Sequence, residues 1–175
     1  MPTVGTPFHV ELVTPERVLF SGEADEVSMR TVEGEITFLA RHEDYIGVAD
    51  VTVVRIVAAA GAGAEKTERE PSETRAAVHG GLVRVDREGV VILAGVAELA
   101  NEIDVVRARA ALKAAEGRLA AGETPAGREV DAATIDVSGQ PTPEGALSLA
   151  LANSPEAAIR RARVRLEAAG AIAPV

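Results

Sequence analysis

A change of hydrophobic period near residue 101 constrains this chain more than any other feature. In Leu82–Asp86 and Val90–Ala94 the apolar residues are mostly β-branched and follow glycine, as is typical of half-buried strands. Beyond Asn101 the apolar residues instead recur at helical spacing, at Val105, Ala108, Leu112, Ala115 and Leu119. Asn101 is a suitable N-cap, and Glu102 and Asp104 fall in the expected first turn. The sequence therefore predicts that a β domain is followed by a helix that begins after Asn101.

Further short strands are expected in the first 60 residues. Alternating apolar and polar residues predict strands at Phe8–Thr14, Arg17–Phe20, Asp25–Thr31, Glu35–Leu39, Tyr45–Val48 and Val51–Val57. Ser21-Gly22 is expected to close the second of these strands, and Ala60–Arg75, which is small, polar and charged, is expected to be a mobile hairpin tip. Strands this short and closely spaced predict antiparallel hairpins that form a sandwich or a closed barrel. We assign residues 1–98 to an antiparallel β-sandwich domain.

Residues 101–175 are predicted to form an antiparallel two-helix hairpin with a long linker at 122–153. The linker is rich in proline and glycine. Ser154 is a good N-cap, Pro155 suits the first helical position, and Gly170 marks the C-terminal end. Apolar residues between them form a second stripe of Ile159, Ala162, Leu166 and Ala169. Two stripes of small residues favour close helix pairing, but each is thin, so we expect the hairpin to be marginally stable.

Composition and charge exclude several classes of function. The formal net charge is −9, and the acidic excess lies in the N-terminal part, which argues against a nucleic-acid partner. Cysteine is absent, which removes disulfide and thiolate chemistry. The sequence has neither a phosphate-binding P-loop nor a nucleophile elbow, and His9, His42 and His79 lack the spacing of metal ligands. We therefore expect no catalytic residue, no metal site, no required cofactor and no membrane-spanning segment.

Four motifs carry a resemblance to a known family. They read V-T-P-E-x-x-L-F-S-G-E-A at Val13–Ala24, E-G-E at Glu33–Glu35, H-G-G at His79–Gly81 and E-I-D-x-x-R-A at Glu102–Ala108. In this order the chain resembles the ε subunit of bacterial F-type ATP synthases (the F1 epsilon chain) over residues 8–121, and Ser154–Ala169 fits the second C-terminal helix of that family.

The resemblance implies a non-catalytic subunit of the central stalk. Such a rotor subunit binds the γ subunit and the c-ring, and it helps to couple proton flow to ATP synthesis. In bacterial relatives the C-terminal helices can extend into the α/β catalytic head and inhibit ATP hydrolysis. The resemblance also implies a peripheral position at the cytoplasmic face of the bacterial plasma membrane, with contact to the membrane only through the complex.

Two sets of site residues follow from this resemblance. ATP, as a regulatory ligand, is expected at the positions that match the family's nucleotide motif, namely Glu98, Ile103, Asp104, Arg107, Ala108, Arg161 and Arg165. An arginine of that motif corresponds here to Ala114. Inhibitory contacts to acidic loops of the head are expected from the basic side of the last helix, at Arg160, Arg161, Arg163 and Arg165. The same arginines also suit a solvated helix face, and Asp104 and Arg107 also suit an ordinary helix ion pair.

The chain departs from the family in the loop Arg41–Tyr45, where relatives carry Gly-His and small residues, and in its longer linker. Three hypotheses remain. The first is a coupling and regulatory rotor subunit, which predicts association with γ. The second is an ATP-sensing module of the same fold without a rotor role, and the third is a β-sandwich scaffold unrelated to the synthase. The long match in register favours the first.

Overall fold

The computed structural model describes residues 6–58, 73–122 and 154–173. The chain forms two compact units. The first consists of Met1–Val105 and Val164–Val175, and the second consists of Val106–Arg163. The domain division predicted at residues 98–101 and the linker at 122–153 stay predictions. Residues 123–153 and 59–72 lie outside the described ranges, so the predicted linker and most of the predicted hairpin tip are not described.

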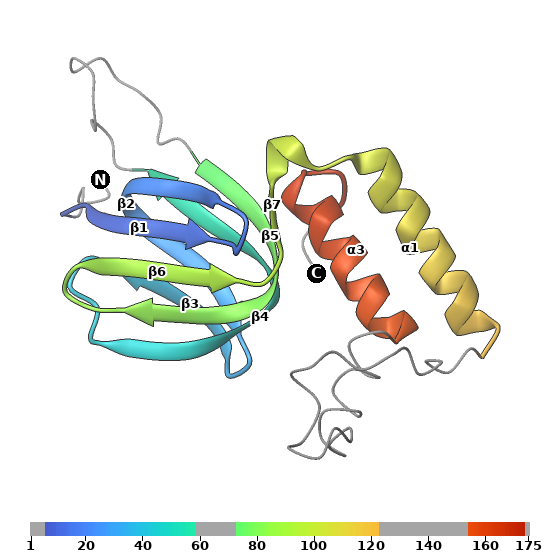
Figure 1. The fold of residues 1–175 in the computed structure, drawn as a ribbon, viewed down its shortest axis with the longest axis horizontal. Helices are drawn as coiled ribbons and strands as arrows, with labels where there is room; N and C mark the ends of the chain where they lie inside the picture. The colour runs from blue at the N-terminus through green and yellow to red at the C-terminus, as the bar shows by residue number, and fades with distance from the viewer. Residues whose placement is uncertain (1–5, 59–72, 123–153, 174–175) are drawn as a thin grey trace. The chain divides into compact units, whose positions relative to one another are not determined.

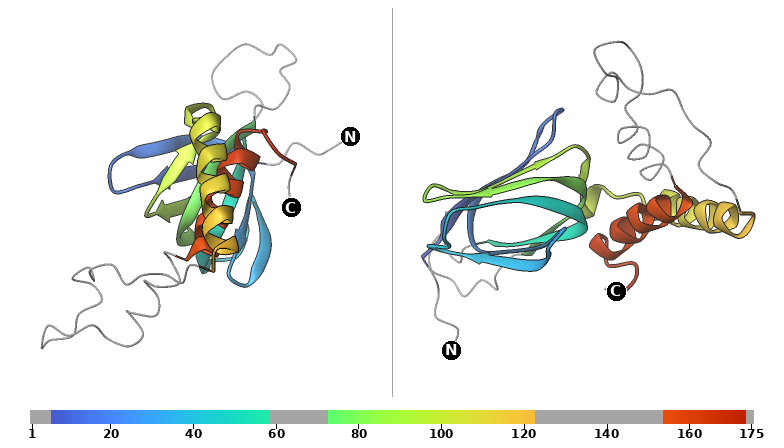
Figure 2. Two further views of the ribbon diagram at one scale, coloured as in Figure 1. Left: turned by 90° about the vertical axis from the view of Figure 1, so that its right-hand side faces the viewer. Right: turned by 90° about the horizontal axis from the view of Figure 1, so that it is seen from below.

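The first unit contains a β-sandwich (Figure 1). Its strands are β1 (Phe8–Val13), β2 (Val18–Thr31), β3 (Gly34–Leu39), β4 (Tyr45–Ala58), β5 (Glu73–Val85), β6 (Gly89–Ala94) and β7 (Ala97–Leu99). The pairing order is β1-β6-β5-β4-β2-β3; β1 also pairs with β2, which closes the ring of strands, and β7 pairs with β5. The long strands β2, β4 and β5 bend and run through both layers, as Figure 2 shows. The predicted fold class is confirmed.

The structure corrects several predictions about the strands. The strands predicted at Arg17–Phe20 and Asp25–Thr31 are one strand, β2, which begins at Val18. Gly22 continues this strand opposite Val10 of β1 and does not end it. The predicted strands on either side of Ala49-Asp50 are likewise one strand, β4. The last residues of the predicted hairpin tip, 73–75, begin β5. Not every pair is antiparallel, because β1 and β6 run parallel.

The sandwich core lies between the two layers. It consists mostly of alanine, valine and isoleucine, together with Leu12, Met29 and one fully buried aromatic ring, Phe38. The alternation in the sequence predicts its faces correctly, because Val10, Leu12 and Val27 are fully buried and Met29 nearly so. The chain thus builds a stable layer pair from aliphatic side chains, and this rigid frame positions the loops and the outer face.

The helices begin and end partly as expected. Ala100–Glu102 forms a short 3-10 helix (η1), and α1 spans Val105–Ala120, so the predicted cap at Asn101 is wrong. Tertiary contacts explain the later start: Glu102 bonds to Arg17, and Ile103 is only 8% exposed in an apolar cluster. α3 spans Pro155–Ala168.

The predicted signals of α3 are confirmed. The Ala157 amide donates to the Ser154 hydroxyl at 3.1 Å, and Gly170 adopts φ 69° just after the helix. Within the second unit, α1 and the first turns of α3 run antiparallel (Figure 1). The buried members of both predicted stripes are alanines there, at Ala108, Ala115 and Ala162.

Candidate functional site

An apolar row crosses four strands on the outward face of one sandwich layer. Val48 of β4 pairs with Leu82 of β5, Leu82 pairs with Leu93 of β6, and Leu93 pairs with Val13 of β1. Val48, Leu82 and Leu93 are 47%, 49% and 50% exposed. Ile46, which lies two residues before Val48 on the same face of β4, is 76% exposed. Directly paired residues share a face of the sheet, so these side chains form a continuous strip.

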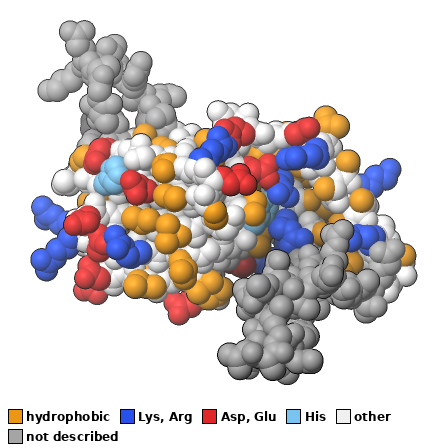
Figure 3. All heavy atoms as spheres, in the orientation of Figure 1, with side chains coloured by type: hydrophobic (Ala, Val, Ile, Leu, Met, Phe, Trp, Pro, Cys, Tyr) orange, Lys and Arg blue, Asp and Glu red, His pale blue; other side chains and the backbone are white. Residues whose placement is uncertain are grey.

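The surface view agrees with this arrangement. In Figure 3, orange side chains gather over the strands that lie at the front of the sandwich in Figure 1. Scattered apolar residues are normal on a protein surface, whereas a contiguous strip on a rigid sheet marks an interaction surface. The apolar row, Val13, Val48, Leu82 and Leu93, is therefore a candidate docking surface for another protein.

An ion pair joins β7 to α3 within the first unit. The Arg165 Nε donates to Glu98 Oε1 at 2.5 Å, and the two side chains are only 23% and 20% exposed. Charge-assisted hydrogen bonds of this kind are stronger than neutral ones, and partial burial reduces screening by water. The structure therefore brings together two residues that the sequence analysis assigned to nucleotide binding.

An apolar cluster belongs to the same unit. Its buried members are Ala77 of β5, Ala168 of α3 and Ile103, which lies between η1 and α1. The partly buried Val53, Val164 and Ala169 pack against them. We call this set the docking cluster, since it joins the last turns of α3 to the sandwich. Ile103, another predicted nucleotide residue, is thus a packing residue in this structure.

The other predicted site residues are placed as follows. Asp104 is exposed in the first unit, whereas Arg107, Ala108 and Arg161 belong to the second unit. Ala108 is 2% exposed, Arg107 is exposed and Arg161 is half-buried. The nucleotide site as a whole stays a prediction.

The four arginines of the predicted inhibitory face differ in their surroundings. Arg160 and Arg163 are exposed, and Arg163 lies 4.0 Å from Glu116 of α1 within the second unit. Arg161 and Arg165 are half-buried. The basic side of α3 is therefore not a uniformly solvated face, and its inhibitory role stays a prediction.

Three carboxyl groups of the first unit have shifted pKa values. Hydrogen bonds from Arg55 and Arg75 lower the pKa of Glu73 to about 2. The paired guanidinium of Arg17 lowers the pKa of Glu102. Burial raises the pKa of Glu167 on α3, and the nearby Arg75 opposes that effect.

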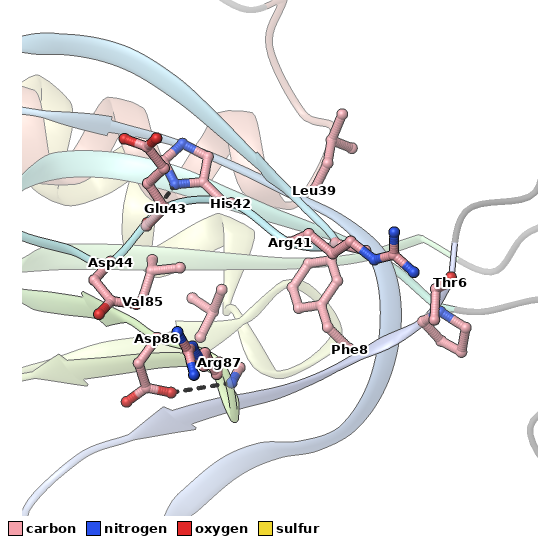
Figure 4. A pocket seen from close by; sticks show the side chains of 14 residues that line it. Thr6, Phe8, Leu39, Arg41, His42, Glu43, Asp44, Val85, Asp86 and Arg87 are labelled. Carbon is pink, nitrogen blue, oxygen red and sulfur yellow. Dashed lines mark hydrogen bonds between the residues drawn. The ribbon is translucent and has the colours of Figure 1, made fainter.

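A hollow of about 750 Å³ lies at one end of the sandwich (Figure 4). The start of β1, the β3–β4 loop and the β5–β6 turn line it with residues of both charges, including Arg41, Asp44 and Arg87. Arg41 adopts a φ of 65°, which is uncommon for a residue with a side chain. The ring of His42 packs edge-on against Phe38 at 5.1 Å between centroids. The β3–β4 loop, whose sequence differs from the family pattern, thus forms one wall of this hollow.

Comparison with known protein families identifies the family of this chain. The sequence model of one family, the β-sandwich domain of the ATP synthase delta/epsilon chain, matches residues 7–100. The chain belongs to this ATP synthase family.

Curated epsilon chains extend the similarity beyond the sandwich. The ATP synthase epsilon chain of Thermobifida fusca is 50% identical over 115 residues, which cover 65% of this chain and 77% of that relative. The epsilon chain of Moorella thermoacetica is 35% identical over 164 residues, or 94% of this chain and 97% of the relative. A chain from the mitochondrial ATP synthase of Euglena gracilis shares the fold, with a TM-score of 0.60, 19% identity, and coverage of 95% of this chain and 83% of that chain.

This membership confirms the family resemblance and the expectation of a non-catalytic epsilon-type subunit. Sequence reasoning missed two features of the site. The apolar row was hidden because each strand contributes only one of its members, and only the register of the sheet aligns them. The direct ion pair between Glu98 and Arg165 was also not predicted, although the family resemblance assigned both residues to one site.

Proposed function

We propose that the chain is a rotor subunit in the central stalk of a proton-translocating F-type ATP synthase and couples proton flow to ATP synthesis. The apolar row carries the proposal, because three of its aliphatic side chains are about half exposed and lie side by side on a rigid sheet. We assign the row to the γ subunit and expect the c-ring as a second partner. The subunit would then lie at the cytoplasmic face of the bacterial plasma membrane, held there only through the complex.

Replacing one member of the row tests this proposal. We expect Leu82→Glu to weaken binding to purified γ subunit at least tenfold, because an unpaired carboxylate is costly to bury at an interface. Val106→Glu is the matched control, since Val106 lies on α1 and is 79% exposed. Thermal unfolding confirms that both variants fold. Unchanged γ affinity in Leu82→Glu would contradict the assignment.

The C-terminal helices are proposed to inhibit ATP hydrolysis by extending into the α/β catalytic head. Within the second unit, the fully or nearly fully buried apolar side chains of the two helices are those of Ala108, Ala115 and Ala162, so this part of the helix pair buries little apolar side-chain area. The exposed Arg160 and Arg163, together with Arg161 and Arg165, offer charges that complement acidic loops.

ATP is proposed as a regulatory ligand rather than a required cofactor. The proximity of Glu98, Ile103 and Arg165 in the first unit favours it, since these residues match part of the family's nucleotide motif. Calorimetric titration with ATP tests this binding. We expect Arg165→Gln to weaken it about tenfold and Arg163→Gln to leave it unchanged. Equal ATP affinity in both variants would place the nucleotide elsewhere.

The alternative is an ATP-sensing module without a rotor role. It shares the predicted ATP titration with the rotor hypothesis but predicts no association with γ. The γ-binding measurement therefore separates the two hypotheses.

A further inference from the structure

The apolar row continues beyond both of its ends. At the β1 end, Val13 pairs with Val18 of β2, which is 56% exposed. At the β4 end, the Val32 amide donates to the Val48 carbonyl at 3.0 Å, and Val32 is 66% exposed. The preceding pair of this β2–β4 ladder is buried, so Val32 and Val48 share the outer face. The complete set, which we call the apolar belt, is Val18, Val13, Leu93, Leu82, Val48 and Val32.

The belt runs across the strands rather than along them. Each of six neighbouring segments contributes one member, and paired strands lie about 4.8 Å apart, so the belt is about 24 Å long. An α-helix rises about 5.4 Å per turn, so each turn of a helix laid along the belt passes over roughly one strand. An amphipathic helix presents apolar side chains on one side at every turn. The belt therefore has the length and the spacing of an apolar helical stripe of about 16 residues.

One side of the belt is flat, and the other is charged. Gly80 of β5 and Gly95 after β6 each lie two residues from a leucine of the belt, so no side chain rises on that side of either leucine. A Cβ at Gly95 would meet no atom within 4 Å, so the space above it is open. On the other side, Glu11 and Arg84 lie two residues from the belt along β1 and β5. A helix can therefore approach the sheet closely on the glycine side and present polar side chains to Glu11 and Arg84 on the other.

The strands under the middle of the belt offer side chains but no free backbone edge. Among the described strands, β1 pairs with β2 and β6, β6 pairs with β1 and β5, and β5 pairs with β4 and β6. Addition of an extended segment to a sheet requires an unpaired edge, which these three strands lack. An occupant must therefore bind through side chains and satisfy its own backbone hydrogen bonds, as an α-helix does.

We propose that the apolar belt receives one amphipathic α-helix of the γ subunit, which lies across the strands with an apolar stripe of about 16 residues along the belt. This inference rests on the proposed function, which names γ as the partner of the apolar row. It adds the kind of element that binds there and the direction in which that element runs. It also extends the contact to Val18 and Val32, the two ends of the belt.

Site-specific cross-linking to purified γ subunit tests the proposal. The chain contains no cysteine, so Val18→Cys and Val32→Cys each provide a single thiol for a short photoreactive label. Each labelled full chain is mixed with γ and irradiated, and the γ residues that react are identified by mass spectrometry. We expect both labels to react with one segment of γ, at positions about 16 residues apart, because a helix rises about 1.5 Å per residue. Thr37→Cys is the control, since Thr37 is exposed on β3 outside the belt and its label should not reach this segment.

Co-sedimentation of the same chains with γ separates this inference from the proposed function. If the labelled chains bind γ but the two reactive positions lie only about seven residues apart, the occupant is an extended strand. If the two labels react with unconnected segments of γ, the occupant is not a single element. Either result overturns the helix and leaves the rotor assignment intact. If the unlabelled chain does not bind γ, the inference and the rotor assignment both fail.

Discussion

Two guanidinium groups converge on one carboxylate at Glu73 on the sandwich surface. Arg55 donates to Glu73 Oε2 at 2.7 Å, and Arg75 of the same strand donates to Oε1. These bonds lower the pKa of Glu73 to about 2. The side chain is 27% exposed, so water screens part of this interaction. A carboxylate with a lowered folded-state pKa stabilises the fold above its unfolded-state pKa and loses that effect as the pH falls.

The pH dependence of one variant measures this contribution. We expect Glu73→Gln to lower the free energy of unfolding by about 0.5–1 kcal/mol at pH 7. The difference should shrink as the pH falls from about 4.5 towards 2, because the native carboxylate is then protonated as well. Urea unfolding at pH 7 and pH 3 provides the measurement. Glu35→Gln is the control, since Glu35 is 80% exposed and lies 3.6 Å from Arg30. A constant difference at both pH values would show that the ion cluster is not the cause.

At the scale of elements, the sequence predicted the ends of a helix correctly where neighbouring residues determine them. Ser154 and Gly170 bound α3 as expected, because a cap and a left-handed turn act within a few residues. The start of α1 was predicted wrongly, because Glu102 is engaged by Arg17, which lies 85 residues earlier. Gly22 was misread as a turn for a similar reason, since its role in β2 depends on β1 opposite. Long-range pairing overrides these local preferences.

The candidate sites show the same contrast between what the sequence can predict and what depends on long-range pairing. The family resemblance assigned Glu98, Ile103 and Arg165 to one site, and the three residues do lie in one unit of the structure, around the end of α3. The apolar row could not be predicted, because Val48, Leu82 and Leu93 become neighbours only through the register of β4, β5 and β6. Each residue alone is an unremarkable exposed aliphatic side chain.

At the scale of the whole molecule, the described residues form a closed β-sandwich and two α-helices. The sandwich has a closed ring of strands and a buried, mostly aliphatic core. Within the first unit, the last turns of α3 contact the sandwich through the docking cluster and the Glu98–Arg165 pair, and within the second unit Ala108, Ala115 and Ala162 are buried. Such a division suits a subunit that stays bound through its sandwich while its helices change position.

One measurement tests this account most directly. ATP hydrolysis is followed with a purified catalytic head that contains γ but lacks this subunit, after addition of the full chain or of a chain that ends at Ala100. Binding is measured in parallel by co-sedimentation. We predict that both chains bind and that only the full chain suppresses hydrolysis, because the proposal assigns anchoring to the sandwich and inhibition to the helices. If neither chain binds to the head, the rotor assignment is wrong.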